Sequence, residues 1–116
     1  MNWIIDFYKD ASGTEPVRVF MDSLSRPVRA KTTRAVEKLA EHGVLLKEPF
    51  TRHVRGKIRE LRIKDAQGNI RILYFTYTGR RFVLLHGFIK KTDKTPDREI
   101  ETAEKRMNDY IKRHGG

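Results

Sequence analysis

The sequence has no cysteine and no long apolar run, and these two absences exclude several kinds of protein. Without cysteine, a chain of 116 residues cannot carry a disulfide framework or a thiolate metal site, and it is typical of a reducing compartment. No apolar segment approaches the roughly 20 residues that span a bilayer, and no basic stretch precedes an apolar run at the N-terminus. We therefore expect a cytoplasmic protein that does not enter a membrane.

Acidic residues are scarce relative to basic ones, with 15 Asp and Glu against 25 Lys and Arg and a net charge of +10 at pH 7. The excess is concentrated, because residues 47–94 contain thirteen basic and four acidic residues, whereas residues 95–116 contain five of each. Clustered positive charge favours a polyanionic partner, since each neutralised phosphate releases condensed counterions. A basic protein whose charges are simply solvated is the alternative, and composition leaves both open.

Hydrophobic residues make up 38% of the chain and are spread along it, which predicts one packed domain over residues 1–116. Two amphipathic helices are expected in the first half of the chain, beginning near Pro16 and Pro27, and a third is expected to begin at Pro96. Gly43 is expected to end the second helix in the left-handed conformation. Runs rich in β-branched and aromatic residues predict strands at 3–8, 57–64, 70–78 and 81–89.

The predicted order of elements is strand, two helices, three strands and a helix. Turn residues at 65–69 and a tight connection at 78–80 join the last three strands into an antiparallel meander. The sequence therefore predicts an α+β fold: an N-terminal strand, a helix hairpin packed on one face of the sheet, a three-stranded antiparallel meander that completes a mostly antiparallel sheet, and a C-terminal helix.

Three motifs extend this interpretation. They read GKIRELRI at residues 56–63, RILYF at residues 71–75 and HGFIKKT at residues 86–92, followed by Thr95-Pro96. The pattern resembles that of the phage-derived HigB-like toxins, a branch of the RelE/ParE superfamily, and the resemblance extends over essentially the whole chain. It implies a RelE/ParE-like fold, a toxin paired with a small antitoxin that is often a helix-turn-helix protein, and cleavage of mRNA bound in the ribosome. The chain departs from the pattern at Ile58, where the family often has an aromatic residue.

Cleavage of RNA without a metal requires a proton acceptor for the 2′-hydroxyl, stabilisation of the pentavalent phosphate and a proton for the leaving oxygen. Arg62 and Arg71 are the candidates for holding the scissile phosphate, because a guanidinium binds two phosphate oxygens and keeps its charge. A surface ion pair with Glu60 or Asp65 is the alternative for each. Two like charges on paired strands are unfavourable without an anion between them.

Lys90 and Lys91 are the remaining catalytic candidates. They alternate sides at the end of a strand, so we expect only one of them to face the substrate, and the sequence does not say which. A lysine crowded by other cations has a lowered pKa and can serve as general acid or base, whereas an uncrowded lysine only binds phosphate.

Other residues are candidates for binding RNA. Lys57 and Arg59 are expected to follow the RNA backbone, with a solvated charged surface as the alternative. Tyr74 and Phe88 are candidates for stacking on a base, although apolar strand positions more often lie in the core. His86 lies in an apolar run and is better interpreted as a hydrogen-bonded core histidine than as a general base. No His or carboxylate cluster has the spacing of metal ligands, so we expect neither a metal nor a cofactor.

Two functions from different classes follow. The first is a ribosome-dependent endoribonuclease that cuts mRNA, inhibits translation and is neutralised by a cognate antitoxin. The second is a binding protein that cleaves nothing, such as a ParE-like topoisomerase poison, a decayed toxin or a plain RNA-binding protein. Arg62, Arg71, Lys90 and Lys91 favour the enzyme, whereas the lack of an assigned general acid or base favours the second.

Overall fold

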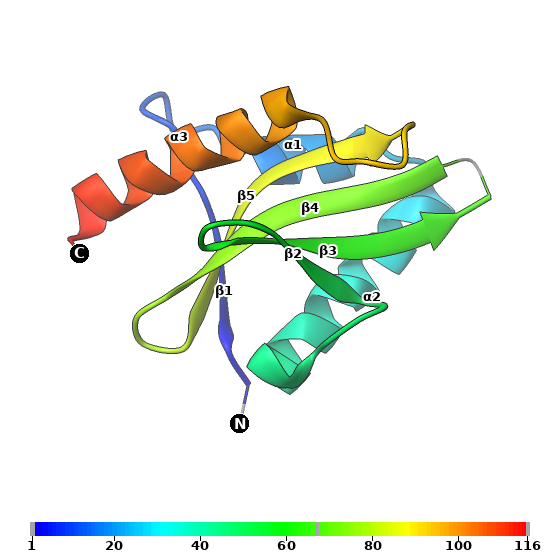
Figure 1. The fold of residues 1–116 in the computed structure, drawn as a ribbon, viewed down its shortest axis with the longest axis horizontal. Coiled ribbons are helices and arrows are strands. Elements are labelled where there is room, and N and C mark those ends of the chain that lie inside the picture. The colour runs from blue at the N-terminus through cyan, green and yellow to red at the C-terminus, as the bar shows by residue number, and fades with distance from the viewer. Residues whose placement is uncertain (1, 67, 116) are drawn as a thin grey trace.

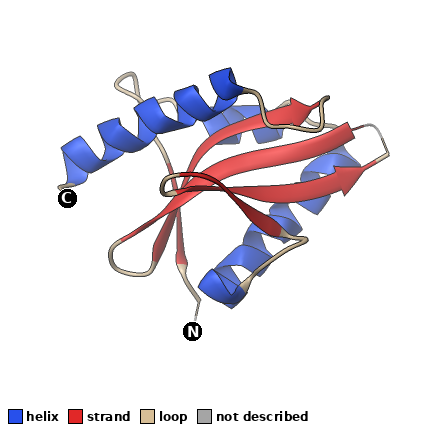
Figure 2. Cartoon of the chain, viewed as in Figure 1, coloured by secondary structure: helices blue, strands red, loops and turns tan. Residues whose placement is uncertain are grey.

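Five strands form one sheet in the computed structural model, which describes residues 2–66 and 68–115 (Figures 1 and 2). The strand order is β1-β5-β4-β3-β2, and β1 runs parallel to β5 while every other neighbouring pair is antiparallel. The strands span β1 (Ile4–Phe7), β2 (Thr51–Arg55), β3 (Ile58–Asp65), β4 (Gly68–Tyr77) and β5 (Arg81–Lys90).

The helices cover both faces of this sheet. α1 (Pro16–Asp22) and α2 (Arg26–His42) pack on one face, and α2 continues into a single turn of 3-10 helix, η1 (Gly43–Leu45). α3 (Asp97–His114) packs on the other face, and Figure 1 shows it on a different side of the sheet from α2. Within the described residues, no helix combines the length and the apolar character needed to cross a membrane.

Alternation along the strands produces a core on each face, because successive side chains of a strand point in opposite directions. On β4, for example, Ile72 and Tyr74 pack towards α1 and α2, whereas Leu73 and Phe75 pack towards α3. A β-bulge opposite Leu73 and Tyr74 adds one residue to β5, and this insertion reverses the alternation in the second half of that strand. The two cores therefore share the central strands, which are buried on both faces.

The predicted α+β class, the helix hairpin on one face and the start of α3 are confirmed. The predicted three-stranded meander is present as β3, β4 and β5, but β2, which was not predicted, adds a fourth antiparallel strand at the edge of the sheet. This strand, TRHVR, carries three charged or polar side chains that face solvent, as edge strands commonly do, and so lacks an apolar run. Gln67, part of the predicted turn at 65–69, lies outside the described residues.

Gly43 ends α2 with a φ of +60°, as predicted, but its ψ of −139° places it outside the left-handed helical region. The glycine is required for a second reason, because a Cβ at this position would collide with the indole ring of Trp3. Trp3 in turn stacks on Phe82, with ring centroids 4.5 Å apart. The absence of a side chain at Gly43 therefore lets the N-terminal segment pack against the end of α2.

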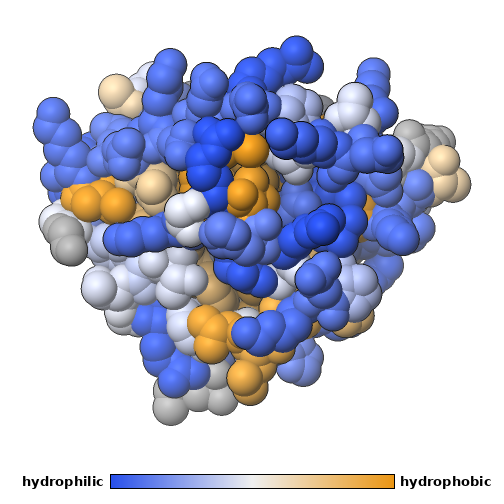
Figure 3. Space-filling model, viewed as in Figure 1, coloured by the Kyte–Doolittle hydropathy of each residue, from blue (hydrophilic) through white to orange (hydrophobic). Residues whose placement is uncertain are grey.

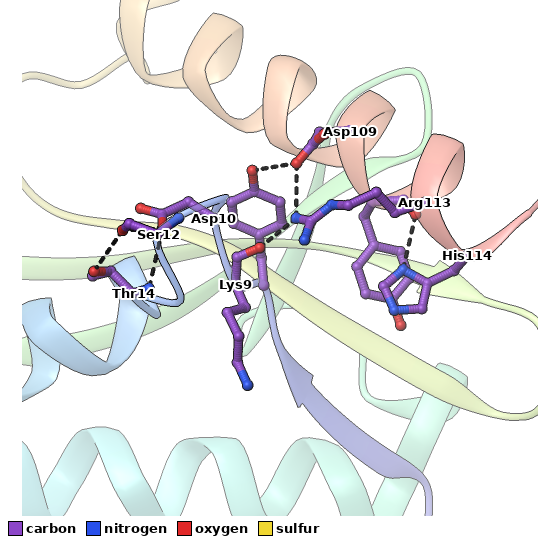
Figure 4. A network of polar contacts seen from close by, with 9 residues as sticks. Lys9, Asp10, Ser12, Thr14, Asp109, Arg113 and His114 are labelled. Carbon is purple, nitrogen blue, oxygen red and sulfur yellow. Dashed lines mark hydrogen bonds and ion pairs between the residues drawn. The ribbon is translucent and has the colours of Figure 1, made fainter.

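Polar contacts anchor the C-terminal half of α3 to the segment that follows β1 (Figure 4). The hydroxyl of Tyr8 donates a hydrogen bond of 2.6 Å to Asp109, and Arg113 contacts both Asp109, at 2.8 Å, and the carbonyl oxygen of Lys9. In the following loop, Asp10 accepts hydrogen bonds from Ser12 and Thr14. The contacts of Asp109 and Arg113 thus hold the C-terminal half of α3 against the segment after β1.

Candidate active site

Three basic side chains meet on the α3 face of the sheet, near the N-terminal end of that helix. Arg62 on β3 lies directly opposite Arg71 on β4, and Lys90 ends β5 two residues after Phe88, the partner of Arg71. Glu60 lies on the same face of β3 as Arg62, because the two positions are two residues apart. We call Arg62, Arg71 and Lys90 the basic cluster, with Glu60 as its buried acid.

The members of this group are withdrawn from solvent. The side chains of Arg71, Glu60 and Arg62 are 3%, 2% and 21% exposed, and Lys90 as a residue is 7% exposed. Buried charges are costly unless they are paired and hydrogen-bonded, and among the described residues Glu60 is the carboxylate within ion-pair distance of both Arg62 and Arg71. The site therefore carries an excess of positive charge in a region that water reaches poorly, which favours the binding of an anion.

The contacts inside the cluster are loose. Oε2 of Glu60 lies 3.7 Å from Nε of Arg71 and 3.8 Å from Nε of Arg62, and neither Nε makes a hydrogen bond within the described residues. Oε1 of Glu60 accepts a hydrogen bond of 3.0 Å from the hydroxyl of Thr95, and Nη1 of Arg71 donates to the carbonyl oxygen of Ile70 at 3.1 Å. Two buried donors thus lack an acceptor in this arrangement, which calls for an explanation in a folded protein.

Burial is the main cause of a lowered pKa at both Lys90 and Arg71. Glu60 opposes this effect by stabilising the positive charge of each group, while the neighbouring cations Arg62 and Arg52 lower each pKa further. Arg71 also lowers the pKa of Lys90. Lys90 therefore gives up its proton more readily than an exposed lysine, which is the property that a proton-transferring group needs.

A cleft of about 340 Å³ opens from solvent onto Lys90 and Glu60, whereas Arg62 and Arg71 do not line it. Its walls include Arg52 and Val54 from β2, Lys94 and Thr95 from the loop before α3, and Ile100 from α3, and both Glu60 and Lys90 line it. Ligand sites are typically concave, and because most residues that line this cleft are charged or polar, Asp93 among them, it suits a charged ligand. A phosphate group that enters the cleft reaches Lys90 without any change in the fold.

A profile of the family described as phage-derived protein Gp49-like (DUF891) matches residues 19–108 of the chain. This segment exceeds half of the chain and contains the whole basic cluster together with Glu60. The chain belongs to this family. The sequence resemblance to phage-derived HigB-like toxins is thereby confirmed.

Two curated relatives, both named probable endoribonuclease HigB1, come from Mycobacterium tuberculosis strains CDC 1551 / Oshkosh and ATCC 25618 / H37Rv. Each is 39% identical to this Gp49-like chain over 62 residues, which make up 53% of the chain and 49% of the relative. The chain thus spans about half the length of the curated relatives it matches.

The structure separates the two lysines at the end of β5 of this Gp49-like protein. Lys90 turns inward to the basic cluster, whereas Lys91 is exposed in the loop that follows. Arg62 and Arg71 do lie near Glu60, as the alternative interpretation had it, but the carboxylate is buried rather than at the surface. Asp65 instead forms an ion pair with Lys31, at 3.1 Å.

The predicted RNA-binding residues are dispersed. Lys57 is exposed in the turn between β2 and β3, and Arg59 lies on the opposite face from the cluster, where it donates to the hydroxyl of Thr51 at 3.1 Å. Tyr74 also lies on that opposite face and is 2% exposed, and Phe88 is 7% exposed on the cluster face. Neither ring has a face on which a base could stack, because each packs within a core.

His86 is a hydrogen-bonded histidine, as predicted. Its Nδ1 lies 3.1 Å from Nη1 of Arg106, which can only donate, so Nδ1 accepts and Nε2 donates to Glu99 at 2.8 Å. Arg106 also donates to the carbonyl oxygen of Leu85 at 2.9 Å. Both ring nitrogens are therefore occupied by structural partners. Among the described residues, no three His, Asp or Glu side chains gather in a way that could hold a metal ion.

Several residues of the site were not among the sequence candidates for function, and they include Glu60, Thr95 and Arg52. The signal for Glu60 was present in the sequence, because a residue two positions before Arg62 on a strand must share its face. Thr95 and Arg52 could not be found in this way, since one lies in a loop and the other on an edge strand without apolar alternation.

Proposed function

We propose that this Gp49-like protein is the toxin of a type II toxin-antitoxin system and acts as an endoribonuclease that cuts mRNA on the ribosome. The observation that supports this most directly is the grouping of Arg62, Arg71 and Lys90 with Glu60, beside a cleft that Glu60 and Lys90 line, in a chain similar to proteins named probable endoribonucleases. A RelE/ParE-like arrangement of a single domain over residues 1–116, a cytoplasmic location and neutralisation by a cognate antitoxin are parts of the same proposal.

The chemistry needs no group beyond the RNA and the side chains of the cluster. The 2′-oxygen attacks the adjacent phosphorus, a bond between phosphorus and the 2′-oxygen forms, and the bond to the 5′-oxygen breaks. Arg71 and Arg62 bind the non-bridging oxygens, whose negative charge grows in the transition state. Lys90, with its lowered pKa, takes the proton of the attacking 2′-hydroxyl in its neutral form and returns it to the leaving 5′-oxygen, so the products are a 2′,3′-cyclic phosphate and a 5′-hydroxyl. The reaction in this proposal is independent of metal.

The surroundings of the cleft suit a polyanion. Arg52 and Lys94 line the cleft, and Lys57 and Lys91 are exposed on the segments that flank it. Figure 3 shows a largely hydrophilic face, on which hydrophobic residues form small separate patches. We assign these exposed cations to the backbone of mRNA or ribosomal RNA, where they contribute affinity that falls as salt rises. An antitoxin with acidic groups is the complementary protein partner.

The test is codon-resolved cleavage of mRNA on programmed ribosomes, followed by primer extension. We expect new 5′ ends within the ribosomal A site, absent without ribosomes, that persist when EDTA is added after the ribosomes have been fixed in a stable complex. Translation inhibited without new ends would instead support the non-cleaving function. Cleavage that disappears in EDTA while the ribosomes stay intact would contradict the metal-independent mechanism.

A further inference from the structure

Glu60, the buried acid of the basic cluster, faces the two arginines that bind the RNA phosphate in the proposed reaction. Glu60 is 2% exposed, and its Oε2 faces both Arg62 and Arg71, the two candidates for binding phosphate. A carboxylate and a phosphate present the same kind of oxygen to a guanidinium. Both cannot hold the same donors at once, so Glu60 must affect how strongly the cluster binds an anion.

The distances show that Glu60 holds these arginines only weakly. Charge-assisted hydrogen bonds between a guanidinium and a carboxylate are about 2.7–2.9 Å long. Here the separations from Oε2 to the Nε atoms of Arg71 and Arg62 are 3.7 and 3.8 Å, and both Nε atoms are buried without a hydrogen-bond partner in the described part of the chain. One oxygen is thus shared by two donors and satisfies neither, so both donors would gain from an anion that brings several oxygens once the side chains turn towards it.

Charge counting leads to the same conclusion. Glu60 offsets one of the three positive charges of the basic cluster, so the empty site keeps an excess that a phosphate diester can reduce. The carboxylate also has an alternative partner, because its Oε1 accepts a hydrogen bond from Thr95 at 3.0 Å. Thr95 lies in the loop before α3 and lines the cleft, so this bond does not depend on the arginines. Glu60 can therefore release the arginines without becoming an unpaired buried acid.

We propose that Glu60 is an internal counter-ion that occupies the anion position of the empty site, and that a phosphate group competes with it for Arg62 and Arg71. This inference rests on the proposed function only for the identity of the anion, the phosphate of RNA. Its consequence is selectivity: the carboxylate weakens the binding of small free anions, so that a ligand must add contacts elsewhere in the cleft to displace it.

The test measures binding of inorganic phosphate to the full chain, without RNA or ribosomes and at constant ionic strength. Titration is followed by calorimetry and by the ¹⁵N-¹H resonances of the arginine Nε groups. Glu60→Gln removes the competing charge and keeps the shape, and we expect it to bind phosphate about tenfold more tightly than the unaltered protein. The Nε signals of Arg62 and Arg71 should shift during the titration.

The matched control is Glu101→Gln, which makes the same charge change on an exposed position of α3. It should bind phosphate as the unaltered protein does, within about twofold, because exposed charges are screened. Unchanged or weaker binding by Glu60→Gln would overturn the proposal, since a residue that merely positions the arginines would lower anion affinity when it is removed.

A second variant acts in the opposite direction. Thr95→Val removes the hydroxyl that holds Oε1 and keeps every charge, so the carboxylate is left to the arginines alone and phosphate binding should weaken by about twofold to fivefold. Tighter binding by this variant would contradict the competition.

The proposal can still be tested if the Glu60→Gln variant does not fold. If Glu60→Gln is unfolded in phosphate-free buffer, the bound anion should replace the missing charge and restore the folded state as phosphate is added. General stabilisation by phosphate is measured with Glu101→Gln. A Glu60→Gln chain that stays unfolded at every phosphate concentration would overturn the proposal.

Cleavage on ribosomes is measured separately with the same variants. Tighter phosphate binding by Glu60→Gln in a protein that cuts no mRNA would support the counter-ion and reject the nuclease. Normal cleavage with unchanged phosphate binding would reject the counter-ion and leave the nuclease standing.

Discussion

Two groups of charged side chains lie on the α3 face of the sheet, and they are built in opposite ways. In the first, His86 bridges Glu99 and Arg106 through hydrogen bonds of 2.8 and 3.1 Å, so the group contains one acidic and one basic side chain. In the second, the basic cluster, Arg62 and Arg71 lie 3.7 to 3.8 Å from Glu60, and Lys90 adds a further positive charge. Each group includes a residue of β5, His86 in the first and Lys90 in the second, and both lie beside α3.

The difference separates a structural contact from a binding site. Buried polar groups in folded proteins are almost always hydrogen-bonded, so a balanced group such as His86 with Glu99 needs no further explanation. A group that keeps unpaired donors and surplus charge lowers stability unless a ligand completes it. The basic cluster has both features, and it borders the cleft of about 340 Å³. We therefore place the chemistry there rather than at the histidine.

The largest effect expected from this contrast is the loss of cleavage in Arg71→Ala. Arg71 lies on a central strand and its side chain is 3% exposed, so its guanidinium is held rigidly where the proposed reaction develops negative charge. Losing one preorganised donor of this kind costs about 10²- to 10³-fold in rate. Stability should fall by no more than about 2 kcal/mol, because Glu60 keeps Thr95 and Arg62. The measurement is cleavage of mRNA on programmed ribosomes, with thermal melting alongside.

Arg106→Ala is the matched control, since Arg106 is a partly buried arginine of the balanced group. It leaves His86 and the carbonyl of Leu85 without their donor, so it should destabilise the protein while the folded fraction still cuts mRNA at a near-normal rate. An Arg71→Ala protein that melts normally and retains cleavage would remove Arg71 from the site and revive the non-cleaving function.

The elements of the fold could be predicted because their apolar spacing is strong. Val17 and Met21 mark the buried face of α1, and Ile100, Ala103 and Tyr110 mark that of α3, as their periodicity indicates. β2 was missed because an edge strand needs only one buried face and tolerates polar residues such as Arg52 and His53. Hydrophobic pattern alone does not identify a strand of this kind.

The candidate site could be predicted only in part, because side-chain direction depends on register. A one-residue shift reverses the face of every later side chain, and the bulge in β5 makes such a shift between Leu84 and His86. The sequence could therefore name Lys90 and Lys91 together but not choose between them. The same limit explains Tyr74, whose aromatic ring suggested a contact with RNA although its strand position directs it to the opposite core.

The next effect concerns proton transfer by Lys90. Lys90→Arg keeps the positive charge but replaces an ammonium of lowered pKa by a guanidinium that stays protonated. If Lys90 exchanges a proton during the reaction, cleavage should fall about a hundredfold while binding of inorganic phosphate persists. The control is Lys91→Arg, which changes an exposed residue and should cleave normally. Equal cleavage by Lys90→Arg and the unaltered protein would reduce Lys90 to a phosphate ligand.

The smallest effect is a gain in stability when the surplus charge is removed. Lys90→Met replaces a buried ammonium by an apolar side chain of similar length, and we expect the free energy of unfolding to rise by about 1 kcal/mol near neutral pH, while cleavage is lost.

The gain in stability of Lys90→Met should depend on pH in a defined direction. Burial lowers the pKa of Lys90 in the folded protein below the ordinary lysine value of 10.5, so between these two values the unfolded chain binds more protons and the stability of the unaltered protein rises with pH. The advantage of Lys90→Met should therefore be full below the lowered pKa and shrink as pH increases towards 10.5. Chemical denaturation at several pH values measures this difference, and Lys91→Met, at an exposed position, should differ from the unaltered protein by less than about 0.5 kcal/mol throughout. A destabilised Lys90→Met protein would show that the cluster is balanced after all, and that its lysine belongs with the structural contacts of His86.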